Sequence, residues 1–97
     1  MPARIAHGEF VAFVRTQVGQ ELTTLKQHKP FTVRYTANGL LFTPGSTAKP
    51  RQQSFDELDH LLEKFAASGS LRPVDYQTST RNASYLLTLI ALYLKRL

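Results

Sequence analysis

The segment from Tyr85 to Leu94 constrains the fold more than any other stretch, because Thr88 is its only residue that is neither apolar nor aromatic. At about 100° per residue, a helix here carries two separate sets of apolar side chains. A helix that is apolar on two sides is buried on two sides. We therefore expect the fold to be built around this helix, and part of it to contact a second copy of the chain. The expected interface residues are Tyr85, Leu89, Leu92 and Phe13.

Length and composition restrict the class of protein. The chain has 97 residues, which suits a single small domain over residues 1–97. The absence of cysteine excludes disulfides and thiolate metal sites. Neither the N-terminal residues nor the apolar run at 86–94 has the length of a signal peptide or a membrane span. We expect a cytoplasmic protein of bacterial type that has no membrane partner.

The first helix is predicted between Glu9 and Gln27, where a stripe of five valine and leucine residues recurs at spacings of three and four. This spacing is typical of a helix that faces a core. Phe10 and Phe13 lie beside the stripe. They form either the edge of the core or a second contact surface.

The apolar period changes from 3.6 to 2 after Pro30, which predicts a half-buried strand. Asn38-Gly39 suits a two-residue type I′ turn, which would pair Tyr35 with Phe42 in a hairpin. A lone hairpin is marginal in water, so its edge needs a partner. That partner is either a short edge strand at 70–74 or a two-fold related copy. The apolar face of the hairpin comprises Phe31, Val33, Tyr35, Ala37, Leu40 and Phe42.

Residues 44–53 are rich in proline and small polar residues, which predicts a loop. Lys49 and Arg51 supply positive charge within it, and the small residues allow backbone N–H groups to approach an anion. The segment is therefore either a phosphate-binding loop or a mobile surface connection. It lacks the Gly-Lys-Ser/Thr order of a P-loop.

Ser54 is predicted to cap the second helix, with Glu57 three residues later completing a capping box and Gly69 ending the helix. Asp56 and His60 lie one turn apart on its polar side. One carboxylate and one imidazole do not make a metal site without further ligands, so a solvated face is the simpler interpretation.

The last helix is capped in this prediction by one of the hydroxyl residues 78–80. Arg81 in its first turn opposes the helix dipole. With Arg72 and Tyr76, it would form an anion site at a helix N-terminus; a polar cap beside a structural tyrosine explains the same residues. The complete prediction is an α+β fold in the order helix, strand, strand, helix, helix, with the last helix central.

Positive charge is concentrated in the first half of the chain. Residues 1–54 carry seven Lys/Arg against Glu9 and Glu21, whereas residues 55–65 carry four carboxylates against Lys64. This polarity suits an anionic partner, nucleic acid first. The same charges are also compatible with an ordinary bacterial surface. The candidate nucleic-acid or anion contacts are Arg34, Lys49, Arg51, Arg72 and Arg81.

The sequence contains no recognisable arrangement of catalytic residues. There is no Gly-x-Ser-x-Gly elbow, the three histidines have no evident nucleophile, and the carboxylates gather on one helix face. We expect no enzymatic activity and no cofactor. A small-molecule pocket lined by Tyr35, Phe42, Tyr76 and Tyr93 is a further hypothesis, although aromatics at this spacing are usually core residues.

The segments 38–45 and 81–87, Asn-Gly-Leu-Leu-Phe-Thr-Pro-Gly and Arg-Asn-Ala-Ser-Tyr-Leu-Leu, carry no family signature. In general form, the short cysteine-free α+β chain resembles the orphan proteins of bacterial mobile gene cassettes, including integrons. The resemblance implies a homo-oligomer. The leading hypothesis is a homodimeric binding or adaptor protein; a nucleic-acid-binding protein and a small-molecule-binding protein are the alternatives.

Overall fold

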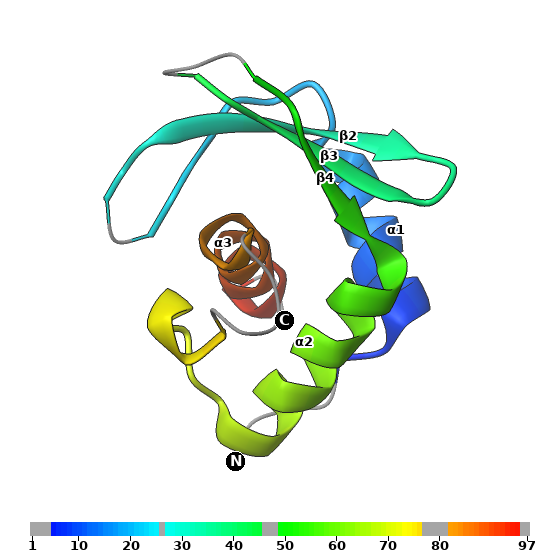
Figure 1. Cartoon of the computed structure of the whole chain (residues 1–97), viewed down its shortest axis with the longest axis vertical. Helices are drawn as coiled ribbons and strands as arrows, with labels where there is room; N and C mark the ends of the chain where they lie inside the picture. The colour runs from blue at the N-terminus through cyan, green and yellow to red at the C-terminus, as the bar shows by residue number, and fades with distance from the viewer. Residues whose placement is uncertain (1–4, 26, 46–48, 77–81, 96–97) are drawn as a thin grey trace.

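The computed structural model describes residues 5–25, 27–45, 49–76 and 82–95. They form the predicted α+β class, with one antiparallel sheet in the strand order β1-β2-β3-β4. All three α-helices lie on the concave side of this sheet (Figure 1). The elements are α1 (His7–Gln17), β1 (Leu22–Thr23), β2 (Pro30–Thr36), β3 (Gly39–Pro44), β4 (Arg51–Ser54), α2 (Phe55–Ser68), the 3₁₀ helix η1 (Pro73–Tyr76) and α3 (Ala83–Lys95).

Helix α1 is shorter than the sequence predicted, so the expected helix from Glu9 to Gln27 is wrong in its second half. The helix ends at Gln17, and the backbone turns at Gly19, whose φ is 88°. Glycine adopts this left-handed conformation without the steric cost of a Cβ atom. The chain then runs extended, and Leu22 pairs with Phe31 as part of β1. Leu22 has helical spacing in the sequence, but its segment forms a strand because it hydrogen-bonds to β2.

The hairpin of β2 and β3 forms, but in a different register from the predicted one. Tyr35 pairs with Leu40 and Thr36 with Gly39, so the turn is at Ala37 and Asn38. The predicted type I′ turn at Asn38-Gly39 is therefore wrong. The register differs by two residues, which is one full period of a strand, so each side chain keeps its expected face. The four residues of that face that are buried are Phe31, Val33, Leu40 and Phe42.

Strand β3 of the hairpin also pairs with β4, which lies in the segment predicted as a loop. Gln53 pairs with Leu40 and Arg51 with Phe42. The predicted edge strand at 70–74 is not formed, because residues 70–72 are irregular and Pro73 begins η1. Proline lacks the N–H that a strand donates, and local side-chain hydrogen bonds favour a turn there.

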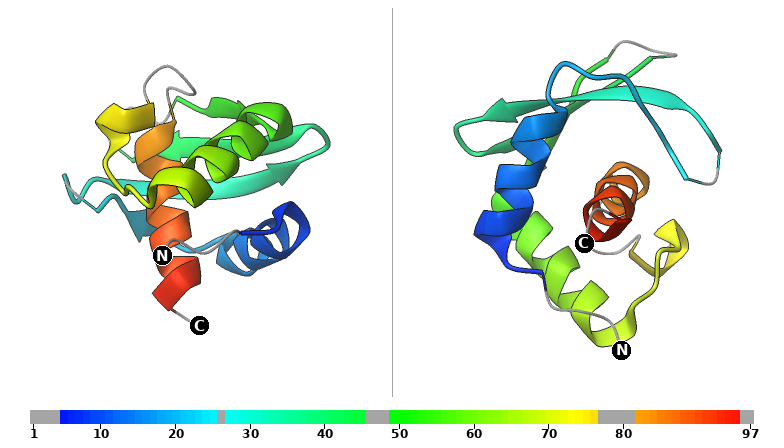
Figure 2. Two further views of the ribbon diagram at one scale, coloured as in Figure 1. Left: turned by 90° about the horizontal axis from the view of Figure 1, so that it is seen from below. Right: turned by 180° about the vertical axis from the view of Figure 1, so that it is seen from behind.

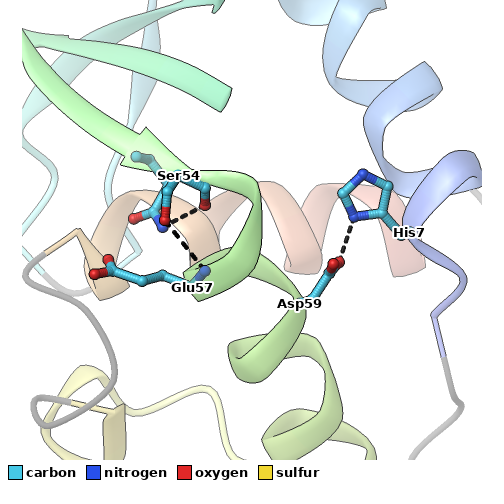
Figure 3. Close-up of polar contacts among 5 residues, drawn as sticks. His7, Ser54, Glu57 and Asp59 are labelled. Atoms are coloured by element: carbon cyan, nitrogen blue, oxygen red, sulfur yellow. Dashed lines mark hydrogen bonds and ion pairs between the residues drawn. The ribbon is translucent and has the colours of Figure 1, made fainter. Parts of the chain in front are cut away.

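Helix α2 begins and ends as predicted. The backbone N–H of Glu57 donates a hydrogen bond to Ser54 Oγ at 3.2 Å, which is the expected N-cap contact (Figure 3). Gly69 follows the helix in the left-handed conformation with φ 68°. The apolar face packs Leu58, Leu61 and Phe65 into the core.

Helix α3 occupies the centre of the fold, as expected from its apolar sequence. Figure 2 shows it beneath the sheet, with α1 and α2 beside it. One end packs against strands: the ring of Tyr85 lies 4.7 Å from that of Phe31 and 5.3 Å from that of Phe42. The other end packs against α1, where the ring of Tyr93 contacts Phe10 and Phe13 at centroid distances of 6.1 and 5.6 Å.

Candidate functional site

The sheet segment carries the whole positive excess of the chain. Between Leu22 and Phe55 there are five Lys/Arg residues and no carboxylate, whereas the rest of the chain has seven of each sign. Helix α2, which follows directly, carries four of the carboxylates. The charge is therefore distributed unequally between the sheet segment, which is positive, and helix α2, which is negative. Such a distribution would steer an anion towards the sheet.

The sheet presents one face that the helices do not cover. Alternation along the strands puts Phe31, Val33, Leu40 and Phe42 on the concave face, with the helices. Arg34 lies on the other face, in register with Leu41 and Gln52 of the neighbouring strands. The described side chains of this outer face include Thr32, Arg34, Thr36, Leu41, Thr43 and Gln52.

The outer face is rich in hydrogen-bonding groups. Three of its side chains are threonines, and Gln52 Nε2 donates to Thr36 Oγ1 at 3.2 Å. Arg34 and Gln52 are exposed. None of the described side chains on this face is a carboxylate or an aromatic ring. The face can therefore bind phosphates, but it offers no ring on which a nucleic-acid base could stack.

Three of the predicted anion contacts lie on or beside the sheet. Arg34 is on its outer face, and Lys49 and Arg51 are exposed at the edge strand β4. Arg51 pairs with Phe42, so strand alternation places it on the concave side of the sheet, at the exposed edge, and not on the outer face with Arg34. Arg72 is not part of the sheet; it directly precedes η1, after helix α2 in the sequence. Arg81 lies outside the described residues.

The expected dimer-interface residues are part of one chain's own core. Leu89 has an exposed fraction of 0% and Phe13 of 6%. Tyr85 and Leu92 are half-buried and pack against the same core. The sheet and the other helices thus cover both apolar sides of α3. Burial of this helix does not require a second subunit.

The four aromatic residues proposed as a pocket are not brought together. Tyr35 is exposed, with the guanidinium of Arg15 lying 4.6 Å from its ring centroid. Phe42 is a core residue beside Tyr85. The other two make separate hydrogen bonds: Tyr76 Oη donates to the backbone oxygen of Ser70 at 2.6 Å, and Tyr93 Oη donates to Glu9 at 3.1 Å.

The structure pairs His7 with Asp59, a contact that no local pattern of residues indicates. His7 Nδ1 contacts Asp59 Oδ1 and joins the start of α1 to α2 (Figure 3). The imidazole also packs edge-on against the ring of Phe55, with centroids 5.1 Å apart. An imidazole held by a carboxylate can act as a general base only beside a nucleophile or a bound substrate.

Among the described residues that line the hollow beside this pair, none is a serine, threonine or cysteine nucleophile. The hollow measures about 600 Å³ and is lined by the described residues Ile5, Ala6, His7, Asp59, Leu62 and Glu63. No group of three or more possible metal ligands among His, Cys, Asp and Glu occurs in the described part of the chain. The pair is best understood as a structural link between the two helices.

A second concavity, which we call the α3 groove, lies between residues 24, 25 and 27, segment 71–74 and helix α3. Its volume is about 380 Å³. The apolar lining consists of Leu25, Leu71, Pro73, Val74 and Leu87, and the polar lining of Thr24, Gln27, Arg72 and Ser84. The three segments are far apart in sequence, so no local pattern indicates this groove.

Comparison with known proteins identifies no relative. No protein-family model matches the chain, and neither the curated proteins nor the solved structures gave a significant match. The resemblance to mobile-cassette proteins therefore stays a prediction. Among the described helices, none combines the length and apolarity needed to cross a membrane.

Proposed function

We propose that the protein is a non-enzymatic nucleic-acid-binding protein that contacts the phosphate backbone with the outer face and the β4 edge of its sheet. One observation carries this proposal: the net charge of +5 lies entirely in the segment that forms the sheet. The helices cover only the concave face, which leaves the outer face open to a partner.

The arrangement of the charges favours an extended anion over a small one. Arg34 is on the outer face of β2, whereas Arg51 lies at the exposed edge strand β4 with the parity of the concave face. Two inter-strand spacings separate the two strands by roughly 10 Å. A single phosphate cannot contact both side chains in a shared pocket. Successive phosphates of a nucleic acid can, and each contact releases counterions from the strand.

The chemistry of the outer face favours duplex over single-stranded nucleic acid. Single-strand binders stack bases on aromatic side chains, whereas threonine hydroxyls, Gln52 and Arg34 bind backbone oxygens. The contacts proposed here carry little sequence information. We therefore expect similar affinities for duplexes of different sequence.

The test is fluorescence anisotropy with labelled mixed-sequence duplex DNA at several salt concentrations. The wild-type protein should bind with a Kd of roughly 1–100 μM near physiological salt, the range of non-specific binding. Arg34→Gln and Arg51→Gln should each weaken binding and lower the slope of log Kd against log salt by roughly one. Lys95→Gln is the control, because it removes the same charge from an exposed position at the end of α3.

Two results would contradict the proposal. Absence of binding at low salt would make the sheet charge incidental. An effect of Lys95→Gln equal to those of the two sheet variants would show that only the net charge matters and that the sheet is no binding surface.

The homodimeric adaptor remains a second proposal, with its contact surface changed. Leu89 and Phe13 are core residues of one chain, so a dimer would have to use exposed surface instead. The resemblance to cassette proteins supports oligomerisation in general form, and the size of the particle in solution tests it.

A further inference from the structure

We propose that the α3 groove binds a small amphipathic molecule, an apolar chain that ends in a single carboxylate. This site is separate from the proposed nucleic-acid surface. It is built from residues 24, 25 and 27, segment 71–74 and the first turns of α3, and it shares none of the residues of the outer sheet face.

The apolar part of the ligand is inferred from where the exposed apolar side chains gather. Five large hydrophobic residues of the described chain are exposed, and three of them, Leu25, Leu71 and Val74, line this one groove. Val74 is the most exposed of the five, at 54%. Isolated exposed apolar residues need no explanation, but a cluster around a concavity marks a binding site.

The carboxylate is inferred from the charge of the groove. Arg72 is the one charged side chain among the described residues that line it, so no lining carboxylate opposes an anion. A guanidinium binds a carboxylate through two parallel hydrogen bonds. The side chains of Thr24, Gln27 and Ser84, the other polar residues of the described lining, are uncharged.

Hydrogen bonds hold the two walls of the groove in place. On one side, the backbone N–H of Leu25 donates to Thr88 Oγ1 of α3 at 3.2 Å. On the other, Tyr76 Oη donates to the backbone oxygen of Ser70, and the N–H of Arg72 donates to Ser70 Oγ at 3.2 Å. Walls that are ordered before the ligand arrives lose little entropy on binding.

The volume limits the size of the ligand. About 380 Å³ is near the lower end of the range of roughly 300–1,000 Å³ found for small-molecule sites. This volume suits a medium-chain carboxylate better than a dinucleotide or a flavin. Decanoate is an appropriate probe, and decanol and decylamine share its chain with a neutral and a cationic end.

The experiment is a titration of the full chain with each of the three probes, below the concentration at which they aggregate, followed by calorimetry and by amide chemical shifts. Decanoate should bind more tightly than decanol, and decylamine most weakly. The amide signals of Leu25 and Arg72 should shift. Arg72→Gln should weaken decanoate binding roughly three- to tenfold, because an exposed charge contact is of modest strength, and should leave decanol binding unchanged.

Matched variants separate this site from the rest of the surface. Val74→Ser should weaken the binding of both decanoate and decanol, whereas Val18→Ser should weaken neither, because Val18 is similarly exposed but lies outside the groove. Arg34→Gln removes the same charge as Arg72→Gln and should leave decanoate binding intact. The two proposals can therefore fail independently.

Equal affinity for decanoate and decanol, with no effect of Arg72→Gln, would overturn the assignment of a carboxylate. Failure of all three probes to shift the amides of the groove would overturn the site itself. Circular dichroism of each variant verifies that a loss of binding is not a loss of fold.

Discussion

Gly39 lies directly against the backbone of strand β4. A Cβ atom added at this position would be 1.8 Å from the backbone oxygen of Gln53, well inside contact distance. The residue pairs with Ser54 within the sheet, and its φ is not among the positive values of the described residues. Its glycine is therefore explained by lack of space rather than by backbone conformation.

Replacement of Gly39 by alanine should destabilise the protein by about 1–3 kcal/mol, because the backbone of β4 must move away to accommodate the methyl group. Chemical denaturation of the two proteins measures this difference. Gly8→Ala is the matched control, since nothing lies within 4 Å of the added Cβ and the position is helical. It should leave stability unchanged or raise it by up to about 1 kcal/mol. Equal stability of both variants would contradict the close pairing of β3 and β4.

Strand β4 and helix α2 are directly continuous, and Ser54 belongs to both. Its backbone pairs with Gly39, while its hydroxyl caps the helix through the N–H of Glu57. The backbone N–H of Phe55 donates in addition to the oxygen of Asn38 in the hairpin turn, at 3.2 Å. Hydrogen bonds therefore attach the start of α2 to the sheet, so the position of the helix depends on the pairing of β4 with β3.

Loss of the Ser54 hydroxyl should destabilise the protein by about 1 kcal/mol, the usual cost of an N-cap. For a domain of this size, Ser54→Ala should lower Tm by roughly 4–8 °C in calorimetry. Ser54→Asp should retain most of the stability, because its carboxylate also accepts from Glu57 and interacts favourably with the helix dipole. If Ser54→Asp were as unstable as Ser54→Ala, the hydrogen bond would not be the source of the effect.

The whole molecule is organised as a curved sheet that encloses α3 together with the other two α-helices (Figure 1). The narrow polar strip of α3 also has a neighbour: Thr88 donates to the oxygen of Ser84 at 2.8 Å and accepts from the N–H of Leu25. Aromatic groups around Tyr85 and around Tyr93 pack against the two ends of the helix. Association would therefore add stability without being needed to bury the helix.

The variant Leu89→Glu tests this arrangement, because a buried carboxylate without a partner is severely unfavourable. The protein should fail to fold, and the milder Leu89→Ala should cost about 2–5 kcal/mol in denaturation experiments. Val18→Glu, at a position with an exposed fraction of 41%, should fold normally. Light scattering of wild type and variants provides the decisive comparison. A dimeric wild type together with a folded, monomeric Leu89→Glu would show that Leu89 is an interface residue.

Local patterns in the sequence were sufficient for several elements. The cap at Ser54, the apolar period of α2 and the stop at Gly69 are all properties of a few neighbouring residues, and each is found as predicted. The faces of the hairpin were also predictable, since a slip of two residues preserves the strand period. The burial of α3 follows from composition alone, because such an apolar helix is unstable in water.

Tertiary structure decided the features that depend on contacts between distant residues. Helix α1 ends where pairing of β1 with β2 competes with helical propensity. Strand β4 and the hairpin register depend on which residues pair across the sheet, and a few neighbouring residues in the sequence do not determine that pairing. The sequence showed that α3 has two apolar sides, but only the fold showed that one chain covers both. The His7–Asp59 pair spans 52 positions, and the α3 groove combines three separate segments. The charge of the sheet segment could be read from the sequence, whereas the placement of Arg34 on the open face and of Arg51 at the β4 edge is a property of the folded molecule.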